Sequence, residues 1–222
     1  MIEKTDFKKT LPGYRATPGR YDVLDLPTRQ YLMIDGLGDP NASPEYSASL
    51  EALYPVAYAV KFNSKRELQR DYVVPPLEGL WWAEDMTVFT SSRDKSKWQW
   101  TLMLLVPVWI DQAMFTAAVD AVRRKSSPAR LDVLRLDTLT EGLCVQTLHL
   151  GPFEEEHRTL QSMHHEFIPS QNLELTGQHH EIYLSDPRRT TPPKLRTILR
   201  QPVGRSGAHS RARGLGHING PF

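Results

Sequence analysis

The sequence predicts an α+β fold made of two similar halves. In each half, a strand-like apolar run is followed by a turn containing glycine and proline, a helical segment and further strands. The turn Gly38-Asp39-Pro40 in the first half corresponds in position to Gly151-Pro152-Phe153 in the second. The composition, 40% hydrophobic and 24% charged in a chain of 222 residues, is typical of a globular protein. We therefore expect an internal duplication of architecture, although the halves share little sequence identity.

The first half opens with a strand and a long helix. Residues 30–35 are predicted to form the strand, and a turn cluster at residues 36–41 ends it. Ser43 and Pro44 are typical of an N-cap followed by proline at the first helical position. The apolar residues of this helix recur at the spacing of one buried stripe: Tyr46, Leu50, Leu53, Tyr54, Ala57 and Val60. Pro55 lies inside the helix and predicts a kink or a break there.

Two strand-like segments rich in tryptophan follow, at residues 71–82 and 97–106. Adjacent residues of a strand point to opposite faces, so Trp81 and Trp82 cannot both be ordinary core residues of one face. Trp100 shares a side with the tryptophan two residues before it. These aromatic side chains are expected to form either a platform for a flat ligand or a wide aromatic core, and the sequence favours neither alternative.

The second half repeats this order. A helix with a basic C-terminal end is predicted over residues 111–125, and a strand over residues 143–150. Three consecutive acidic residues, Glu154-Glu155-Glu156, then mark the start of another helix. Its apolar stripe consists of Leu160, Met163, His164 and Phe167.

The strand predicted at residues 177–184 carries the most unusual side chain of the chain. A two-residue period places His179, Glu181 and Tyr183 on one face. The other face is expected to hold His180, Ile182 and Leu184. A carboxylate at the centre of an otherwise apolar strand costs free energy unless it is paired, exposed in a cleft, or used in chemistry. Glu181 is therefore the first candidate for a functional residue.

The domain organisation follows from these patterns. Residues 1–20 are polar and are expected to form a lead-in that lies against the body without joining its core. The two halves are predicted at about residues 21–108 and 109–203. Residues 191–200 are expected to form a short helical or extended closing segment. Residues 204–222, rich in Gly, Arg, Ser and His, are predicted to be a disordered basic tail.

Several function classes have no support in the sequence. Cys144 is the only cysteine, which excludes an internal disulfide and predicts a buried, inert thiol in a cytoplasmic protein. Residues 1–7 lack the apolar core of a signal peptide, so we expect none, and no stretch approaches the length of a membrane span. No sequence typical of serine hydrolases, phosphate loops or dinucleotide sites occurs. His164-His165 and His179-His180 could supply metal ligands, but they do not have the spacing of a known metal motif. Adjacent histidines on a strand also point to opposite faces. We expect no metal, no cofactor and no nucleic-acid partner.

The acidic run at residues 154–156 and Glu181 are candidates for a pair of working carboxylates. A helix start and the returning strand of a strand-helix-strand unit can meet at one end of a sheet. Two carboxyl groups in one apolar cleft raise the pKa of one of them, which suits acid–base chemistry near neutral pH. The alternative is that the acidic run only complements the helix dipole.

Several separated motifs together resemble the GyrI-like small-molecule-binding proteins, and most closely the cyclopropanoid cyclopropyl hydrolases among them. The resemblance covers about residues 14–203 and is carried by these segments: 36–41 (GLGDPN), 76–82 (PLEGLWW), 141–146 (EGLCVQ), 151–156 (GPFEEE) and 179–189 (HHEIYLSDPRR). It implies two β-α-β-β modules of the SHS2 type, related by a pseudo-twofold axis, with antiparallel sheet and a cleft between them for flat aromatic ligands. It also implies hydrolytic opening of the cyclopropane in DNA-alkylating natural products of the yatakemycin and CC-1065 type, which would give protection against such compounds.

The resemblance assigns the catalytic glutamates to Glu156 and Glu181. It places the aromatic cleft at Trp82, Tyr54 and Tyr183, with further candidates at Trp81, Trp100, His179 and Phe153. His157 departs from the proline expected after the acidic turn, and the tail has no counterpart. The hypothesis is that one glutamate, preferably Glu181, takes a proton from the attacking water. The alternative is a binding or effector-sensing module without catalysis. We expect a monomer or a weak homodimer.

Overall fold

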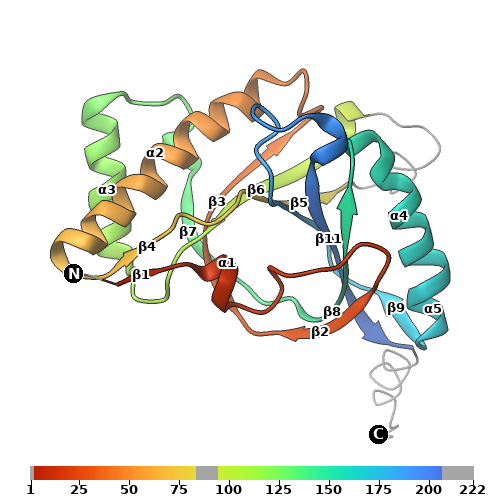
Figure 1. Ribbon diagram of the computed structural model, residues 1–222. Coiled ribbons are helices and arrows are strands. Elements are labelled where there is room, and N and C mark those ends of the chain that lie inside the picture. The colour runs from red at the N-terminus through yellow and green to blue at the C-terminus, as the bar shows by residue number, and fades with distance from the viewer. Residues whose placement is uncertain (1–2, 84–94, 207–222) are drawn as a thin grey trace, which may run out of the picture.

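A single large antiparallel sheet forms the centre of the protein (Figure 1). The computed structural model describes residues 3–83 and 95–206. In space, eight strands follow the order β2-β8-β11-β10-β5-β6-β3-β7, and β9 pairs with the far end of β11. Their bounds are β2 Asp22–Leu26, β3 Arg29–Leu37, β5 Glu78–Trp82, β6 Gln99–Leu105, β7 Arg135–Leu139, β8 Gly142–Leu150, β9 Leu173–Leu175, β10 His179–Tyr183 and β11 Arg196–Arg205. The predicted α+β class with antiparallel sheet is confirmed.

The two halves have the same connectivity. The first runs β3-α2-β5-β6 and the second runs β8-α4-β10-β11, and β5 pairs with β10 in the middle of the sheet. One strand of each half pairs with the other half. Strand β2 of the first half pairs with β8, and β7 of the second half pairs with β3. The functional candidates on β10 therefore lie at the junction of the two halves.

Helices cover one face of the sheet. They are α2 (Pro44–Glu67), α3 (Gln112–Lys125), α4 (Glu156–Ser162) and α5 (Ile168–Ser170), with a π-helical turn, η5 (Met163–Phe167), between the last two. In Figure 1, α2 and α3 lie together over one half and α4 and α5 over the other. Side chains of α2 and α3 pack on β3 and β6, whereas Met163 and Ile168 pack on β8 and β11.

Of the kink or break predicted at Pro55, the break does not occur, because α2 continues through this residue. Proline removes one helical hydrogen bond and typically costs about 3 kcal/mol inside a helix. Pro55 itself is exposed. The buried residues on either side, among them Leu53 and Val56, are part of the main core cluster. Their burial, worth roughly 1.5–3 kcal/mol for each large side chain, outweighs that penalty.

The N-terminal segment joins the core on the other face, contrary to the expectation for residues 1–20. The short strand β1 (Lys4–Thr5) pairs in parallel with β4 (Asp71–Tyr72), and helix α1 (Phe7–Thr10) follows. Tyr14 is 3% exposed and packs among apolar side chains of the central strands. The N-terminal segment therefore covers this face of the sheet and contributes to its core.

The C-terminal segment agrees with the helical or extended closing segment predicted at residues 191–200, and it continues beyond residue 200. Residues 192–194 form a 3₁₀ turn, η6 (Pro192–Lys194), and residues 196–205 form the long interior strand β11. The strand includes the first two residues of the predicted tail, Gly204 and Arg205. The rest of the predicted tail, residues 207–222, lies outside the described residues. Other 3₁₀ turns among the described residues are η2 Lys95–Lys97, η3 Leu131–Val133 and η4 Phe153–Glu155.

Candidate functional site

The pairing of β5 with β10 places the candidate residues on the helix-covered face. Glu181 lies opposite Gly79, and His179 lies opposite Trp81. Because side chains alternate along a strand, His179, Glu181 and Tyr183 share this face, as the sequence predicts. His180 and Ile182, which point the other way, are fully buried.

A chain of hydrogen bonds fixes the carboxylate of Glu181. The indole Nε1 of Trp81 donates to the hydroxyl oxygen of Tyr183 at 3.0 Å. That hydroxyl in turn donates to Oε2 of Glu181 at 2.7 Å. Burial and the charge of Glu181 raise the pKa of Tyr183, so the phenol keeps its proton and remains a donor. Oε1 of Glu181 lies 3.4 Å from Nε2 of His179, and the Glu181 side chain is 15% exposed.

Gly79 is required for this arrangement. A Cβ atom at this position would lie 2.9 Å from Nε1 of Trp81 and 3.3 Å from the hydroxyl of Tyr183. Any larger residue would displace the indole that donates to Tyr183. The glycine therefore provides the space next to Glu181 in which the two aromatic rings meet.

The second carboxyl group, Glu156, enters the site from the start of α4. The preceding turn η4 exposes Glu154 and Glu155 and directs Glu156 inward, where it is 5% exposed. Burial and the charge of Glu181 raise its pKa well above the usual value. Thr197 on β11 favours the charged form, but its hydroxyl makes no hydrogen bond of normal geometry among the described residues. Glu156 therefore holds its proton to higher pH than an exposed carboxyl group does.

Aromatic and imidazole rings surround the two carboxyl groups. The ring of Phe153 meets Tyr183 edge to face at a centroid distance of 5.7 Å. Burial and the charge of Glu181 also raise the pKa of Tyr46, which places this residue of α2 beside Glu181. His164 of η5 faces His179 at 6.3 Å. The sequence pattern interprets Tyr46 and His164 only as parts of apolar helical stripes and so misses their place in the site.

Other candidates lie elsewhere. Trp82 points to the opposite face of the sheet, where it packs beside Leu80. Trp100 is on the correct face but is fully buried, and its indole donates to the carbonyl of Gly38 at 3.3 Å. Tyr54 is half-buried on α2, and its pKa is raised by burial, with Arg188 and Asp186 acting in opposite directions. Tyr54 therefore lies near the turn after β10.

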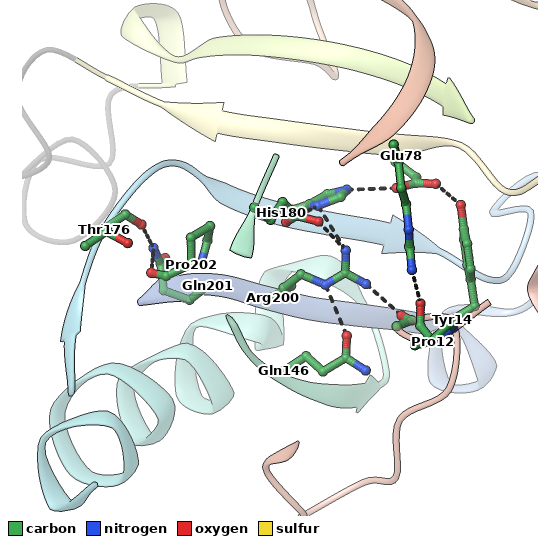
Figure 2. Close-up of polar contacts among 12 residues, drawn as sticks. Pro12, Tyr14, Glu78, Gln146, Thr176, His180, Arg200, Gln201 and Pro202 are labelled. Atoms are coloured by element: carbon green, nitrogen blue, oxygen red, sulfur yellow. Dashed lines mark hydrogen bonds and ion pairs between the residues drawn. The ribbon is translucent and has the colours of Figure 1, made fainter. Parts of the chain in front are cut away.

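A buried ionic network lies on the opposite face, directly behind the site (Figure 2). His180 is held between two carboxylates, 3.0 Å from Glu78 and 2.8 Å from Glu141. Arg200 of β11 binds Glu141 at 2.7 Å and Gln146 at 3.1 Å. Because His180 and Glu78 are next to Glu181 and Gly79 in sequence, these ion pairs fix the strands that carry the site.

The N-terminal segment completes this network. The hydroxyl of Tyr14 donates to Glu78, and the carbonyl of Gly13 accepts from Arg200 at 2.7 Å. Arg29 donates to the carbonyl of Pro12. The thiol of Cys144 is fully buried nearby, and burial, with the charge of Glu141, raises its pKa to about 12. The predicted burial of this cysteine is confirmed.

Comparison with known proteins identifies the family. A model of the GyrI-like small molecule binding domain matches residues 20–203. The chain belongs to this family. A crystal structure of an uncharacterized conserved protein from Listeria innocua is 38% identical, with a TM-score of 0.82 over 90% of this chain and 100% of that one. Another, described as a hydrolase from Listeria innocua, is 36% identical, with a TM-score of 0.79 over 90% and 100%.

A more distant structure shares only the fold of this GyrI-like protein. The EcmrR C-terminal domain is 9% identical, with a TM-score of 0.50 over 84% of this chain and 98% of that one. Among curated proteins, none is significantly similar to this chain.

In this GyrI-like domain, the described residues contain no group of three or more histidine, cysteine or acidic side chains suited to a metal ion. Within residues 3–83 and 95–206, no helix is long and apolar enough to cross a membrane. The polar side chains of the site are the two carboxyl groups, the phenol of Tyr183 and the imidazoles of His164 and His179.

Two surface cavities lie outside this group. One of about 390 Å³ borders the start of α4 and includes His149 and Arg158. The other, of about 340 Å³, lies on the opposite face beside Trp82 and Arg135. Neither is lined by Glu156 or Glu181.

Proposed function

We propose that this GyrI-like protein is a hydrolase that opens the cyclopropane of cyclopropanoid DNA-alkylating natural products of the yatakemycin and CC-1065 type. The observation that carries the proposal is the pair of carboxyl groups in unlike environments. Glu156 is buried and has a raised pKa, whereas Glu181 accepts a hydrogen bond from Tyr183. Such a pair can divide the roles of acid and base. The 36% identical relative described as a hydrolase supports an enzymatic role.

The binding site in this proposal is a cleft between two modules related by a pseudo-twofold axis. The junction of β5 and β10 supports that position, because it joins the two halves. Phe153 and Tyr46 flank Glu181 from opposite halves of the chain. A flat ligand between them would contact aromatic surface while its reactive carbon lies near the carboxylate.

The reaction consists of adding one water molecule. Glu181 takes a proton from water, and the water oxygen forms a bond to the least hindered carbon of the cyclopropane. The C–C bond to the adjoining ring breaks, and its electron pair moves into that ring to give a phenolate. Protonated Glu156 donates a hydrogen bond, and then its proton, to the developing phenolate. The proton taken by Glu181 returns to Glu156 through solvent, which restores the enzyme.

The origin of the oxygen tests this mechanism. CC-1065 should be incubated with the protein in water enriched in ¹⁸O, and the product analysed by mass spectrometry. The proposal predicts one ¹⁸O atom per product molecule, in a new hydroxyl group on the former cyclopropane carbon. A product without ¹⁸O, or a protein-bound adduct in place of free product, contradicts it.

A second candidate function is drug sequestration or effector sensing without turnover. The description of the family as small molecule binding supports this alternative. Incubation with excess CC-1065 separates the two. A sequestering protein protects at most a stoichiometric amount of compound, whereas a hydrolase continues to form product.

A further inference from the structure

Two histidines beside the carboxyl groups have buried ring nitrogens without hydrogen-bond partners. Within the described part of the chain, neither ring nitrogen of His179 nor Nε2 of His164 makes a hydrogen bond. The two rings meet edge to face, with centroids 6.3 Å apart and an interplanar angle of 78°. Buried polar atoms in folded proteins are nearly always paired. Among the described residues, these nitrogens are therefore available to a hydrogen-bonding ligand.

The backbone around His164 has an unusual conformation. His164 lies in the π-helical turn η5, which interrupts an otherwise α-helical run from Glu156 to Ser170. Such turns are rare and occur frequently at functional sites. Met163, one residue earlier, is fully buried against β8 and β11. The turn thus anchors the helix in the core while it holds His164 against His179 of the sheet.

Glu156, beside these histidines, is a third residue with a buried polar atom that has no hydrogen-bond partner within residues 3–83 and 95–206. Oε1 of Glu156 is buried and has no hydrogen-bond partner among the residues that the structure describes. Glu156 is close enough to Glu181 for that charge to raise its pKa, and Glu181 lies 3.4 Å from His179. Three separate elements, the start of α4, the π-turn and β10, therefore direct unsatisfied polar atoms towards one neighbourhood.

We propose that His164 and His179 form a recognition subsite for an uncharged hydrogen-bonding edge of the planar ligand, an N–H group next to a carbonyl oxygen. This inference rests on the proposed function, because it assigns the substrate contacts that lie beside Glu181. It names His164 as a specificity-determining residue of the site and gives His179 a defined role in it.

The chemistry of the two rings favours such an edge. A neutral imidazole has one donor and one acceptor, so two of them complement a group that also offers both. Burial and the neighbouring His179 and His165 lower the pKa of His164 to about 4, which keeps this ring neutral near pH 7. An anionic ligand group would lose its hydration here beside the carboxylate of Glu181, and the neutral ring of His164 offers no compensating charge. An amide or pyrrole N–H beside a carbonyl has no such penalty.

The test uses the Glu181→Gln variant, in which the proposed turnover is blocked and binding is observed alone. Indole-2-carboxamide, a planar probe with the required edge, is titrated while the ring ¹⁵N signals of the histidines are recorded by NMR. The subsite predicts shifts at His164 and His179. It also predicts that a second substitution, His164→Phe, weakens probe binding at least fivefold, because its ring fills the same space without nitrogen atoms.

The matched control is His165→Phe, which changes the exposed neighbour in the same π-turn and should leave probe binding unaltered. His179→Phe tests the subsite from the strand, in case His164→Phe disturbs the helix. Absence of shifts at both imidazoles, or unchanged probe affinity in folded His164→Phe and His179→Phe, overturns the inference. The proposed hydrolysis is judged separately by product formation in the wild-type protein, so either idea can fail while the other holds.

Discussion

The hydroxyl of Tyr183 lies 2.7 Å from Oε2 of Glu181 and donates a hydrogen bond to it. Tyr183 is itself held by Trp81, which donates to the same hydroxyl at 3.0 Å. The orientation of the proposed base therefore depends on two aromatic side chains from the two strands that join the halves of the sheet.

Replacing Tyr183 by phenylalanine should lower kcat for CC-1065 about tenfold to a hundredfold, with a smaller effect on KM. The ring remains, but the donor that orients Glu181 is lost, and one well-placed hydrogen bond contributes on this scale. Steady-state kinetics of the purified variant measure both constants. Tyr58→Phe, an exposed tyrosine on α2, is the matched control. An unchanged kcat in Tyr183→Phe would show that this bond does not support catalysis.

Replacing Glu156 by glutamine should change how stability depends on pH. The pKa of Glu156 is raised in the folded protein, so unfolding releases its proton at pH values between the unfolded and folded pKa values. The wild-type free energy of unfolding therefore falls as pH rises above about 4.3, by up to about 1.4 kcal/mol per pH unit from this group. Urea unfolding of the two proteins between pH 4.5 and 7 compares the slopes.

The glutamine variant should lack this part of the slope and be the more stable protein at pH 7. Glu155→Gln, which alters the exposed neighbour, serves as the control. Identical slopes for wild type and Glu156→Gln would mean that the carboxyl group is ionised in the folded state, and the proposed acid would then be lost.

The contribution of Glu141 to stability should depend on pH in the opposite direction. Burial opposes its ionisation, but the charges of His180 and Arg200 outweigh this and lower its pKa to about 2. Its contribution to stability is present above about pH 4.3, the unfolded value, and is lost as pH falls towards 2. In Glu141→Gln, this acid-dependent loss should be absent.

The same substitution leaves two buried cations short of a carboxylate. We expect a loss of about 3–5 kcal/mol at pH 7, as when one partner of a buried ion pair is removed. Urea unfolding at pH 7 and acid titration followed by circular dichroism measure the two effects. Glu51→Gln on the exposed side of α2 is the control. Wild-type stability in Glu141→Gln at both pH values would contradict the ionic network.

Gly79→Ala should destabilise the fold by about 1–3 kcal/mol, the usual range for an overpacked core position. The added Cβ would lie 2.9 Å from Nε1 of Trp81, so the indole has to move away from Tyr183. The fluorescence of the tryptophans and the urea midpoint should both change. A variant with the wild-type midpoint and full activity would show that the Trp81–Tyr183 contact is dispensable.

The sequence was sufficient to predict local features of the site. Alternation along residues 177–184 predicts that His179, Glu181 and Tyr183 share a face, because the period of a strand depends only on its own residues. Likewise, the two neighbouring tryptophans do point to opposite faces. Which of them joins Glu181 depends on the register between β5 and β10, strands about a hundred residues apart, and local periodicity carries no information on that register.

Most of the features that could not be predicted from the sequence involve buried polar or charged side chains. Strand β11 contains Arg200 and Gln201, which interrupt its apolar pattern, yet both are buried. Their partners, including Glu141 and Gly13, are distant in sequence. The burial of Tyr14 has the same origin, since its hydroxyl donates to Glu78. Such pairings satisfy polar groups only once the sheet is assembled, so hydropathy alone assigns these residues to the surface.

The central claim is that Glu181 activates water for hydrolysis and is not needed for binding. The most direct measurement is the number of product molecules formed per protein molecule from excess CC-1065, for the wild type and for Glu181→Gln. We expect many turnovers for the wild type and none for the variant, whose affinity for CC-1065 stays within a few-fold of the wild type. Wild-type turnover in a correctly folded Glu181→Gln protein would contradict it.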